Sequence, residues 1–212
     1  MIPNAYKILQ LLGSATKVII IIMFLLTSVS SSQSSCISKP VKPKTIFNEL
    51  AHGYLGVRNG TVVITESKQT LYIVTVYMDP EAQRDHRKSS KFLIFDPAAR
   101  RYICLMSKKK HRFVAKKYPK PEELCWFAEE DTSTHYQVRY VVEYDHNHYA
   151  LKFFKNGKLM RPAHKSNPKS EVFMSSIESS DCNTATTKFC NNLSNKRHHK
   201  QSLTIRKICS RN

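Results

Sequence analysis

Glycine and acidic residues are both scarce in this sequence. It contains only 5 glycines in 212 residues, against 10 tyrosines and 10 phenylalanines. This composition excludes a low-complexity chain and favours a packed, aromatic-rich body that folds by itself. Only 16 Asp and Glu residues oppose 34 Lys and Arg, which leaves a formal charge of +18. Because an ordinary solubilising surface mixes both signs, such an excess indicates a polyanionic partner.

Motifs for catalysis and metal binding are also missing. The sequence has no Gly-x-Ser-x-Gly, no His-Glu-x-x-His, no phosphate-cradling glycine loop and no Cys-x-x-Cys or Cys/His spacing of a metal site. The main enzymatic alternative is a basic, ribonuclease-like protein that uses histidines such as His146 and His148, or His198 and His199. Such an enzyme also needs a positioned lysine or oxyanion donor, and no motif signals one. We therefore expect no enzyme, no catalytic residue, no cofactor and no metal.

The N-terminal segment contains an unbroken apolar run of only nine residues, Val18–Leu26. Lysines precede this run, and mostly small polar residues follow it at 28–32. A membrane-spanning helix needs about 20 apolar residues, and Gln10 and Lys17 interrupt any longer span, so an uncleaved anchor is the weaker alternative. The pattern predicts a signal peptide over residues 1–32. The protein is expected to be secreted and extracellular, without membrane insertion after cleavage.

Basic residues gather in three segments. Residues 108–120 carry seven Lys or Arg and no acid, and residues 152–169 carry six and no acid. Residues 178–212 carry seven more, against Glu178 and Asp181. Inside a cell the matching polyanion would be nucleic acid. Behind a signal peptide it is a sulfated glycan, which binds through the same release of counterions, so we expect no nucleic-acid partner.

The six cysteines point to disulfides, because a secreted chain folds in an oxidising environment. Cys104 and Cys125 lie within the aromatic-rich body, and the alternative for Cys104 is a buried free thiol. The other cysteines can pair among themselves in the polar C-terminal part and with the N-terminal one; they are Cys36, Cys182, Cys190 and Cys209.

Three parts follow the signal peptide. Residues 33–49 are polar and proline-rich, which predicts an extended N-terminal arm. Residues 50–177 alternate apolar and polar positions in short runs, which is typical of strands. Residues 178–212 show no such pattern and are expected to form an irregular, basic, cysteine-containing tail. The predicted strands lie near Val62–Thr65, Leu71–Met78, Phe92–Phe95, Tyr102–Met106, Arg112–Ala115, Cys125–Ala128, Gln137–Val142, His148–Phe153 and Glu171–Met174.

An internal repeat narrows the fold. Segments that begin at Tyr54, Tyr102 and Tyr149 each have a tyrosine, mostly apolar residues, a polar or basic turn and a returning apolar strand, with starts 48 and 47 residues apart. A Cys-Trp-Phe triplet ending at Phe127 and a Glu-Val-Phe triplet ending at Phe173 recur 46 residues apart. Three β-rich units of similar length predict an all-β fold, a β-trefoil with a pseudo-threefold repeat. Alternation alone would also allow a β-sandwich.

Three motifs of this body follow one another in a distinctive order. They are Tyr102-Ile103-Cys104-Leu105 with a Lys-rich hairpin, Cys125-Trp126-Phe127-Ala128-Glu129, and Tyr149-Ala150-Leu151-Lys152 with Asn156-Gly157-Lys158. In these motifs the chain resembles the fibroblast growth factors. The resemblance implies a β-trefoil domain over residues 50–177 that binds the ectodomain of a fibroblast growth factor receptor tyrosine kinase together with heparan sulfate. Cysteines at the positions of Cys104 and Cys125 are similar to those of the subfamily of the eighth factor, in which they are bridged.

Motif position also assigns receptor-binding residues. Glu129 falls on the family's receptor-contacting glutamate and Tyr136 on the tyrosine of its Asn-Asn-Tyr loop, seven positions away as in the family. Met174, which follows Phe173 in its strand, is expected to add a soft apolar contact. Without the resemblance, Glu129 would be interpreted as a solvated strand-end carboxylate and Tyr136 as a core ring.

Heparan sulfate is expected to bind the first hairpin and the basic loop after Gly157, because these are the family's positions. Arg and Lys pair with sulfate as they do with phosphate. The loop departs from the family pattern, since its Lys152–Gly157 turn is two residues longer and the glycan-box glycines and threonine are replaced around Pro162–Lys165. The expected heparan-sulfate-binding residues are Asn59, Lys152, Lys158, Arg161, His164, Lys165 and Lys169.

Two sequons predict glycosylation at Asn59 and Asn192. A sugar on Asn59 would compete with heparan sulfate, and because Asn-Gly is also a good hairpin turn, an unused sequon is the alternative there. The alternative to a signalling ligand is a secreted trefoil lectin or protease inhibitor. Such a protein would share the fold but not the spacing of Glu129 and Tyr136.

Overall fold

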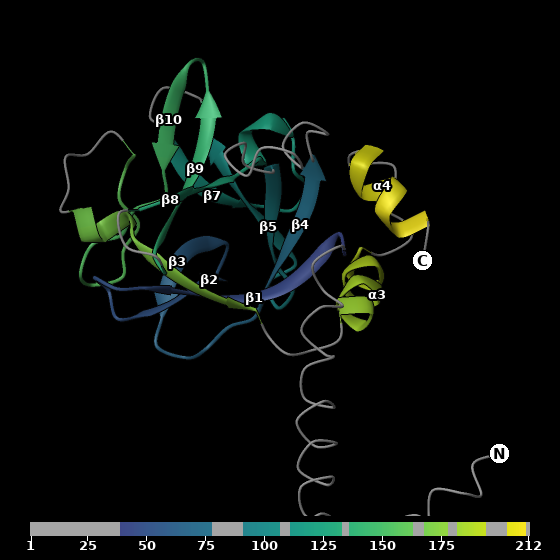
Figure 1. Ribbon diagram of the computed structural model, residues 1–212, viewed down its shortest axis with the longest axis horizontal. Coiled ribbons are helices and arrows are strands. Elements are labelled where there is room, and N and C mark those ends of the chain that lie inside the picture. Colours follow the sequence, from purple (N-terminus) through teal and green to yellow (C-terminus); the bar gives the residue numbers. More distant parts are fainter. Residues whose placement is uncertain are drawn as a thin grey trace, which may run out of the picture. The chain divides into compact units, whose positions relative to one another are not determined.

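Strands dominate the part of the chain that the computed structural model describes, which comprises residues 39–77, 91–106, 111–132, 136–162, 168–177, 182–193 and 203–210. Within these residues, 11 strands form one antiparallel sheet (Figure 1). The expected all-β fold is therefore correct for the body, while the predicted signal peptide, residues 1–32, lies outside the described residues. The strands are β1 (Val41–Asn48), β2 (Gly53–Arg58), β3 (Thr61–Thr65), β4 (Leu71–Tyr77), β5 (Lys91–Asp96), β6 (Arg101–Met106), β7 (Arg112–Lys116), β8 (Ala128–Asp131), β9 (Val138–Tyr144), β10 (Asn147–Ala150) and β11 (Phe173–Ile177).

Strand β1, Val41–Asn48, lies in the second half of the segment 33–49 that was expected to be an N-terminal arm, so the domain begins before residue 50. Along its length β1 pairs first with β4, then with β11, and at its end with β2. Val41 and Ile46 of this strand are completely buried. The sequence hides this apolar spacing because Lys42, Pro43 and Lys44 lie between the two core residues.

One predicted strand begins later than expected. Glu123–Cys125 forms a short 3-10 helix, η2, and β8 begins only at Ala128. The N–H of Cys125 donates to the carbonyl oxygen of Glu122 at 2.8 Å, so this backbone is used in a turn before the sheet resumes. Phe127 still makes an antiparallel bridge to Phe92. The other predicted strands overlap observed ones.

The inner core is built in part from the three tyrosine-led segments, which lie at β2, β6 and β10. Each segment contributes a pair of buried apolar side chains, two residues apart as expected for one face of a strand. Phe127 and Phe173, which end the recurring triplets, are also completely buried in this core. The three pairs are Leu55 with Val57, Ile103 with Leu105, and Leu151 with Phe153.

Strands β4, β5 and β6 are apolar on both faces. Since successive side chains of a strand point to opposite sides, the neighbours of the inner-core residues form a second, outer cluster. Strands of this kind need a cover on each side. The outer cluster on these strands comprises Tyr72, Val74, Leu93, Phe95, Tyr102 and Cys104.

Two helices, α3 (Cys182–Asn192) and α4 (Leu203–Ser210), cover this outer cluster, and we refer to them as the helical cap. The predicted irregular tail is thus wrong for these residues. Cys182, Ala185, Thr186 and Phe189 are buried and follow the 3.6-residue period of a helix. The polar hydroxyl of Thr186 can be buried because it donates a hydrogen bond to the carbonyl oxygen of Cys182 at 2.8 Å. Neither cap helix, nor any other helix in the described ranges, is long and apolar enough to cross a bilayer.

One disulfide lies within the body and another lies within the cap. Cys104, in β6, is bonded to Cys125, at the end of η2, and both side chains are completely buried. Cys190 is bonded to Cys209, which joins α3 to α4. Cys182 is also disulfide-bonded. Cys36 lies outside the described residues.

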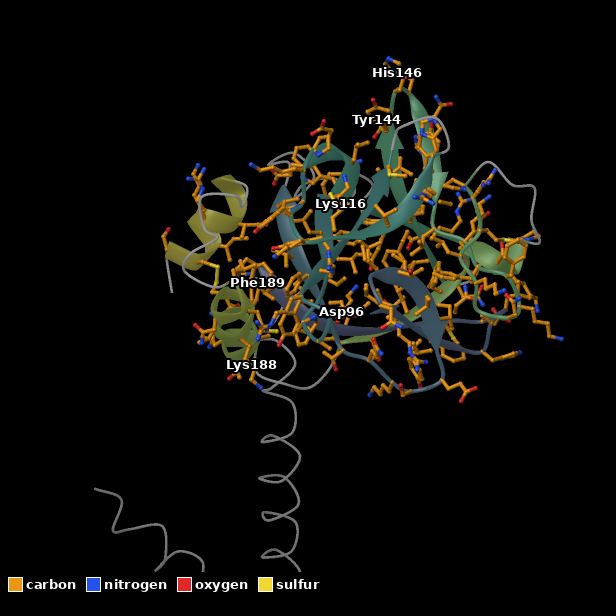
Figure 2. The ribbon with its side chains drawn as sticks, turned by 180° about the vertical axis from the view of Figure 1, so that it is seen from behind. Asp96, Lys116, Tyr144, His146, Lys188 and Phe189 are labelled. Carbon is orange, nitrogen blue, oxygen red and sulfur yellow. A yellow bond between two sulfur atoms is a disulfide. The ribbon has the colours of Figure 1, made fainter. Side chains whose placement is uncertain are left out.

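A buried carboxylate fixes the turn between β5 and β6 to β2. Asp96 is almost completely buried (Figure 2). Its two oxygens accept the backbone N–H of Val57 at 2.8 Å and that of Ala99 at 2.9 Å. A buried charge is tolerated when hydrogen bonds of this kind replace its water.

Replacing the aromatic anchor of the cap should destabilise the whole domain. The Phe189 ring is completely buried, 5.2 Å from the ring of Phe95 between centroids (Figure 2). We expect Phe189→Ala to lower the free energy of unfolding by about 3–5 kcal/mol, measured by urea denaturation. The exposed neighbouring change Lys188→Ala is the control and should alter that free energy by less than about 0.5 kcal/mol. Equal, small effects of both variants would contradict the packing of α3 on the sheet.

Candidate binding surface

The hairpin formed by β8 and β9 carries two of the predicted receptor-binding residues. Its register pairs Glu129 with Tyr140 and Asp131 with Val138, and the N–H of Thr132 donates to the carbonyl oxygen of Gln137 at 3.1 Å. Tyr136 therefore lies in the loop of the hairpin, where it is 87% exposed. A core position for this ring is excluded. The seven-residue spacing corresponds to one hairpin with Glu129 on its first strand.

Glu129 is half-buried and engaged, so it is not a freely solvated strand-end carboxylate. Its Oε1 accepts a hydrogen bond from Lys44 Nζ of β1 at 2.7 Å and another from the Tyr140 hydroxyl at 3.1 Å. Its side chain keeps 33% of its surface exposed. These contacts hold the carboxylate in one orientation while leaving it accessible to a partner.

Met174 lies on β11 beside aromatic residues that the sequence analysis did not assign. It pairs across the strands with Phe47 of β1 and is 40% exposed. Phe47 in turn pairs with Tyr54 of β2, and the two rings meet edge to face with centroids 5.3 Å apart. We call Phe47, Tyr54 and Met174 the apolar row. The signal for Phe47 was present in the sequence, but its assignment to an arm removed it from the domain.

Glu129 and the apolar row lie on opposite sides of β1. Glu129 contacts Lys44, which shares a face of β1 with the buried Ile46, whereas Met174 lies beside Phe47 on the other face. They are nevertheless carried by neighbouring strands, because Phe173 of β11 pairs with Val138 of β9. Strand β9 pairs both with β8, which carries Glu129, and with β11, which carries Met174, but Glu129 and Met174 lie on opposite sides of β1. Tyr136 lies in the loop between β8 and β9.

A polar pocket of about 610 Å³ adjoins the hairpin. Its lining includes three acidic residues, Glu49, Asp131 and Glu171, and two basic ones, Arg139 and Lys169, and most of these are paired. Arg139 Nη2 donates to Glu130 at 2.8 Å and Arg139 Nη1 lies 3.6 Å from Glu171. Lys169 lies 3.5 Å from Glu49, which also accepts a hydrogen bond from Gln137 at 2.8 Å. The hairpin is therefore tied to the end of β1 and to the 3-10 helix η3 (Pro168–Glu171).

The predicted heparan-sulfate-binding residues divide into three groups. Lys158 and Arg161 are exposed and have no acidic partner among the described residues. Lys152 is only 16% exposed and pairs with Glu171 at 3.2 Å, and Lys169 is exposed but pairs with Glu49. His164 and Lys165 lie outside the described residues. Among the described residues predicted to bind heparan sulfate, Lys158 and Arg161 are therefore the cations best placed for an anionic ligand.

Asn59 lies away from this basic loop. It occupies the two-residue turn between β2 and β3 with Gly60, and both have positive φ, +51° and +74°, as expected for Asn-Gly. The basic loop instead contacts β3 near the end of the β2–β3 hairpin that is remote from this turn. There the N–H of Ile64 donates to the carbonyl oxygen of Gly157 at 3.2 Å. The structure does not bring Asn59 together with Lys158 and Arg161.

Both predicted glycosylation sites stay predictions. Asn59 is exposed, so its sequon is accessible. Asn192 is half-buried at the end of α3, next to the buried Leu193.

No group of three or more His, Cys, Asp or Glu side chains arranged to hold a metal occurs among the described residues. His146 lies exposed at the turn between β9 and β10 (Figure 2), and His148 lies exposed in β10. Nδ1 of His148 is 2.9 Å from Oε1 of Glu130. The alternative of a histidine-based enzyme gains no positioned lysine or oxyanion donor from these contacts.

Stability should fall steeply at alkaline pH because buried tyrosines resist ionisation. Burial, reinforced by the nearby Glu129 carboxylate, raises the pKa of Tyr140 well above its ordinary value of about 10. The folded state therefore keeps this proton while the unfolded chain loses it. The stabilisation is complete below about pH 10 and decreases above it by about 1.4 kcal/mol per pH unit for each such group.

The test is urea denaturation between pH 8 and pH 11. Burial also raises the pKa of Tyr102, with the Glu122 carboxylate adding to the effect, and it raises the pKa of Tyr72, so three tyrosines contribute. Tyr140→Phe should reduce the slope above pH 10 by the share of one group, whatever its effect at pH 8. If the free energy of unfolding decreased equally per pH unit above pH 10 in Tyr140→Phe and in the unaltered protein, the raised pKa of Tyr140 would be contradicted.

No protein-family model matches the chain, and no curated protein matches it. The functional interpretation therefore depends on the residues and contacts described above.

Proposed function

We propose that this protein is a secreted growth factor that binds and activates a fibroblast growth factor receptor tyrosine kinase, with heparan sulfate as co-receptor. The observation that carries the proposal is the placement of Glu129 and Tyr136 on one hairpin, at the spacing of the family's receptor-contacting pair. The proposal includes a β-trefoil for the domain and membership of the fibroblast growth factor family.

The proposed trefoil is supported by the threefold use of the tyrosine-led segments. Segments at β2 and β6 each turn back into a paired strand, and the segment that begins in β10 turns back through the bridge between Phe153 and Leu159. Each segment sends a pair of apolar side chains into one common core. Three equivalent units that share a core are what a pseudo-threefold fold requires, because no unit can bury its apolar face alone.

Receptor binding is supported by the exposure of Tyr136 and by the apolar row. Interfaces depend on a few anchors, and tyrosine is enriched among them because its large ring has few rotatable bonds. Tyr136 presents nearly all of its surface, and Phe47, Tyr54 and Met174 add an aromatic and soft apolar surface on the adjoining strands. Glu129 is pre-oriented by Lys44 and Tyr140, which lowers the entropy lost when it binds.

Heparan-sulfate binding is supported by charge and by accessibility. The chain carries a formal charge of +18, and Lys158 and Arg161 project from the loop after Phe153 without an acidic neighbour in the described region. Two disulfides in the described part of the chain fit folding in an oxidising compartment, as the proposed secretion requires.

Two variants separate receptor binding from glycan binding. Tyr136→Ala should weaken binding to the receptor ectodomain by about 10- to 100-fold, as for a hot-spot tyrosine, and leave the salt needed for elution from heparin unchanged. Lys158→Ala with Arg161→Ala should lower that salt concentration, because fewer counterions are released, and should leave receptor binding without heparin unchanged. Binding is measured with immobilised ectodomain, with and without heparin, followed by receptor phosphorylation in cells.

Lys188→Ala, on the exposed side of the cap, is the control for both assays. Equal losses in both assays for both variants would overturn this division of roles. Heparin binding without any receptor response would instead favour the trefoil lectin or protease inhibitor.

A further inference from the structure

The two disulfides of the described region differ in their access to solvent. Cys104 and Cys125 are completely buried within the outer cluster. Cys190 and Cys209 are half-buried at the edge of the same cluster. Because thiol–disulfide exchange requires a thiolate to reach a sulfur atom, a reductant reaches Cys190–Cys209 first.

The two helices of the cap also differ in what holds them. Helix α3 has 11 residues and buries Cys182, Ala185, Thr186 and Phe189, with the Phe189 ring among those of Tyr72 and Phe95, and Cys182 is itself disulfide-bonded. Helix α4 has eight residues and buries Ile205, with Ile208 half-buried beside it. A helix of eight residues is not stable alone in water. The order of α4 therefore depends on its docking and on the bond from Cys209 to α3.

We propose that α4 is a thiol-sensitive latch over the outer cluster, opened by reduction of Cys190–Cys209 while α3 and the sheet stay folded. The reductant is a small thiol or a dithiol reductase of the thioredoxin class. Its thiolate attacks one sulfur to form a mixed disulfide, and a second thiol of the reductant displaces that cysteine. The protein gains two electrons and two protons as the thiols of Cys190 and Cys209, and the reductant is oxidised to its disulfide.

Opening the latch uncovers apolar surface that the closed protein hides. Ile205 leaves its buried site, and the outer cluster to which it belongs loses part of its cover. Trp126 is the only tryptophan in the chain and is half-buried against this cluster. Its fluorescence therefore reports the position of the cap without any added label.

The proposal is independent of the proposed receptor function, and its test uses the mature, oxidised protein. Increasing concentrations of reduced glutathione are added, free thiols are trapped by alkylation, and each cysteine is identified by mass spectrometry. We expect Cys190 and Cys209 to be alkylated at reductant concentrations at least about 10-fold lower than Cys104 and Cys125. At that stage hydrogen exchange of residues 203–210 should accelerate at least about 10-fold, while β4–β6 stay protected, and Trp126 emission should shift to longer wavelength.

Two variants on the same helix test the role of docking. Ile205→Ala should lower the reductant concentration at which Cys190 and Cys209 are alkylated, because it weakens the closed state. Lys207→Ala, an exposed change on α4, should leave that concentration unchanged. If Ile205→Ala does not fold, alkylation and hydrogen exchange of the unaltered protein still decide whether the latch opens.

Two results would overturn the latch. One is alkylation of Cys104, Cys125, Cys190 and Cys209 at the same reductant concentration, accompanied by loss of protection in β4–β6. This result would mean global unfolding. The other is reduction of Cys190–Cys209 with unchanged exchange in residues 203–210, which would mean that the bond does not hold α4.

Discussion

Strand β1 is the constraint on which the other features depend. It pairs with β4 on one side and with β11 on the other, and so joins strands from the beginning and the end of the domain. Ile46 of this strand enters the inner core and Val41 enters the outer cluster under the cap. Lys44 orients Glu129, and Phe47 supplies the centre of the apolar row. The cores, the cap and the candidate binding surface are therefore parts of one hydrogen-bonded arrangement.

Much of the sheet could be predicted from the sequence, because β-rich runs between turn residues are a local signal. Strand β1 could not, since its burial comes from pairing with distant strands and its lysines and proline resemble a linker. The cap could not be predicted from hydrophobicity either, because α3 buries a threonine and a cysteine next to one alanine and one phenylalanine. The helical period of positions 182, 185, 186 and 189 was present in the sequence, but only two of these four residues are conventionally apolar.

The candidate surface shows the same division between local and long-range information. Glu129 and Tyr136 lie seven residues apart in one hairpin, so their placement is a local matter and follows from the motif. Phe47 and Met174 are brought together only by the pairing of β1 with β11. Asn59 was assigned by family position across a segment where the motifs are weak, and the hairpin turns it away from the basic loop. The ion pair of Lys152 with Glu171 depends on tertiary contacts that charge counting does not register.

The double-sided apolar character of β4, β5 and β6 has a consequence for how the protein is made. These strands leave the ribosome before α3 and α4, so their outer face has no cover of its own during much of synthesis. An uncovered surface with Tyr72, Leu93 and Phe95 on adjacent strands is prone to self-association and is a typical substrate for chaperones. Completion of α3 and α4 would thus mark the point at which the nascent domain no longer needs such assistance.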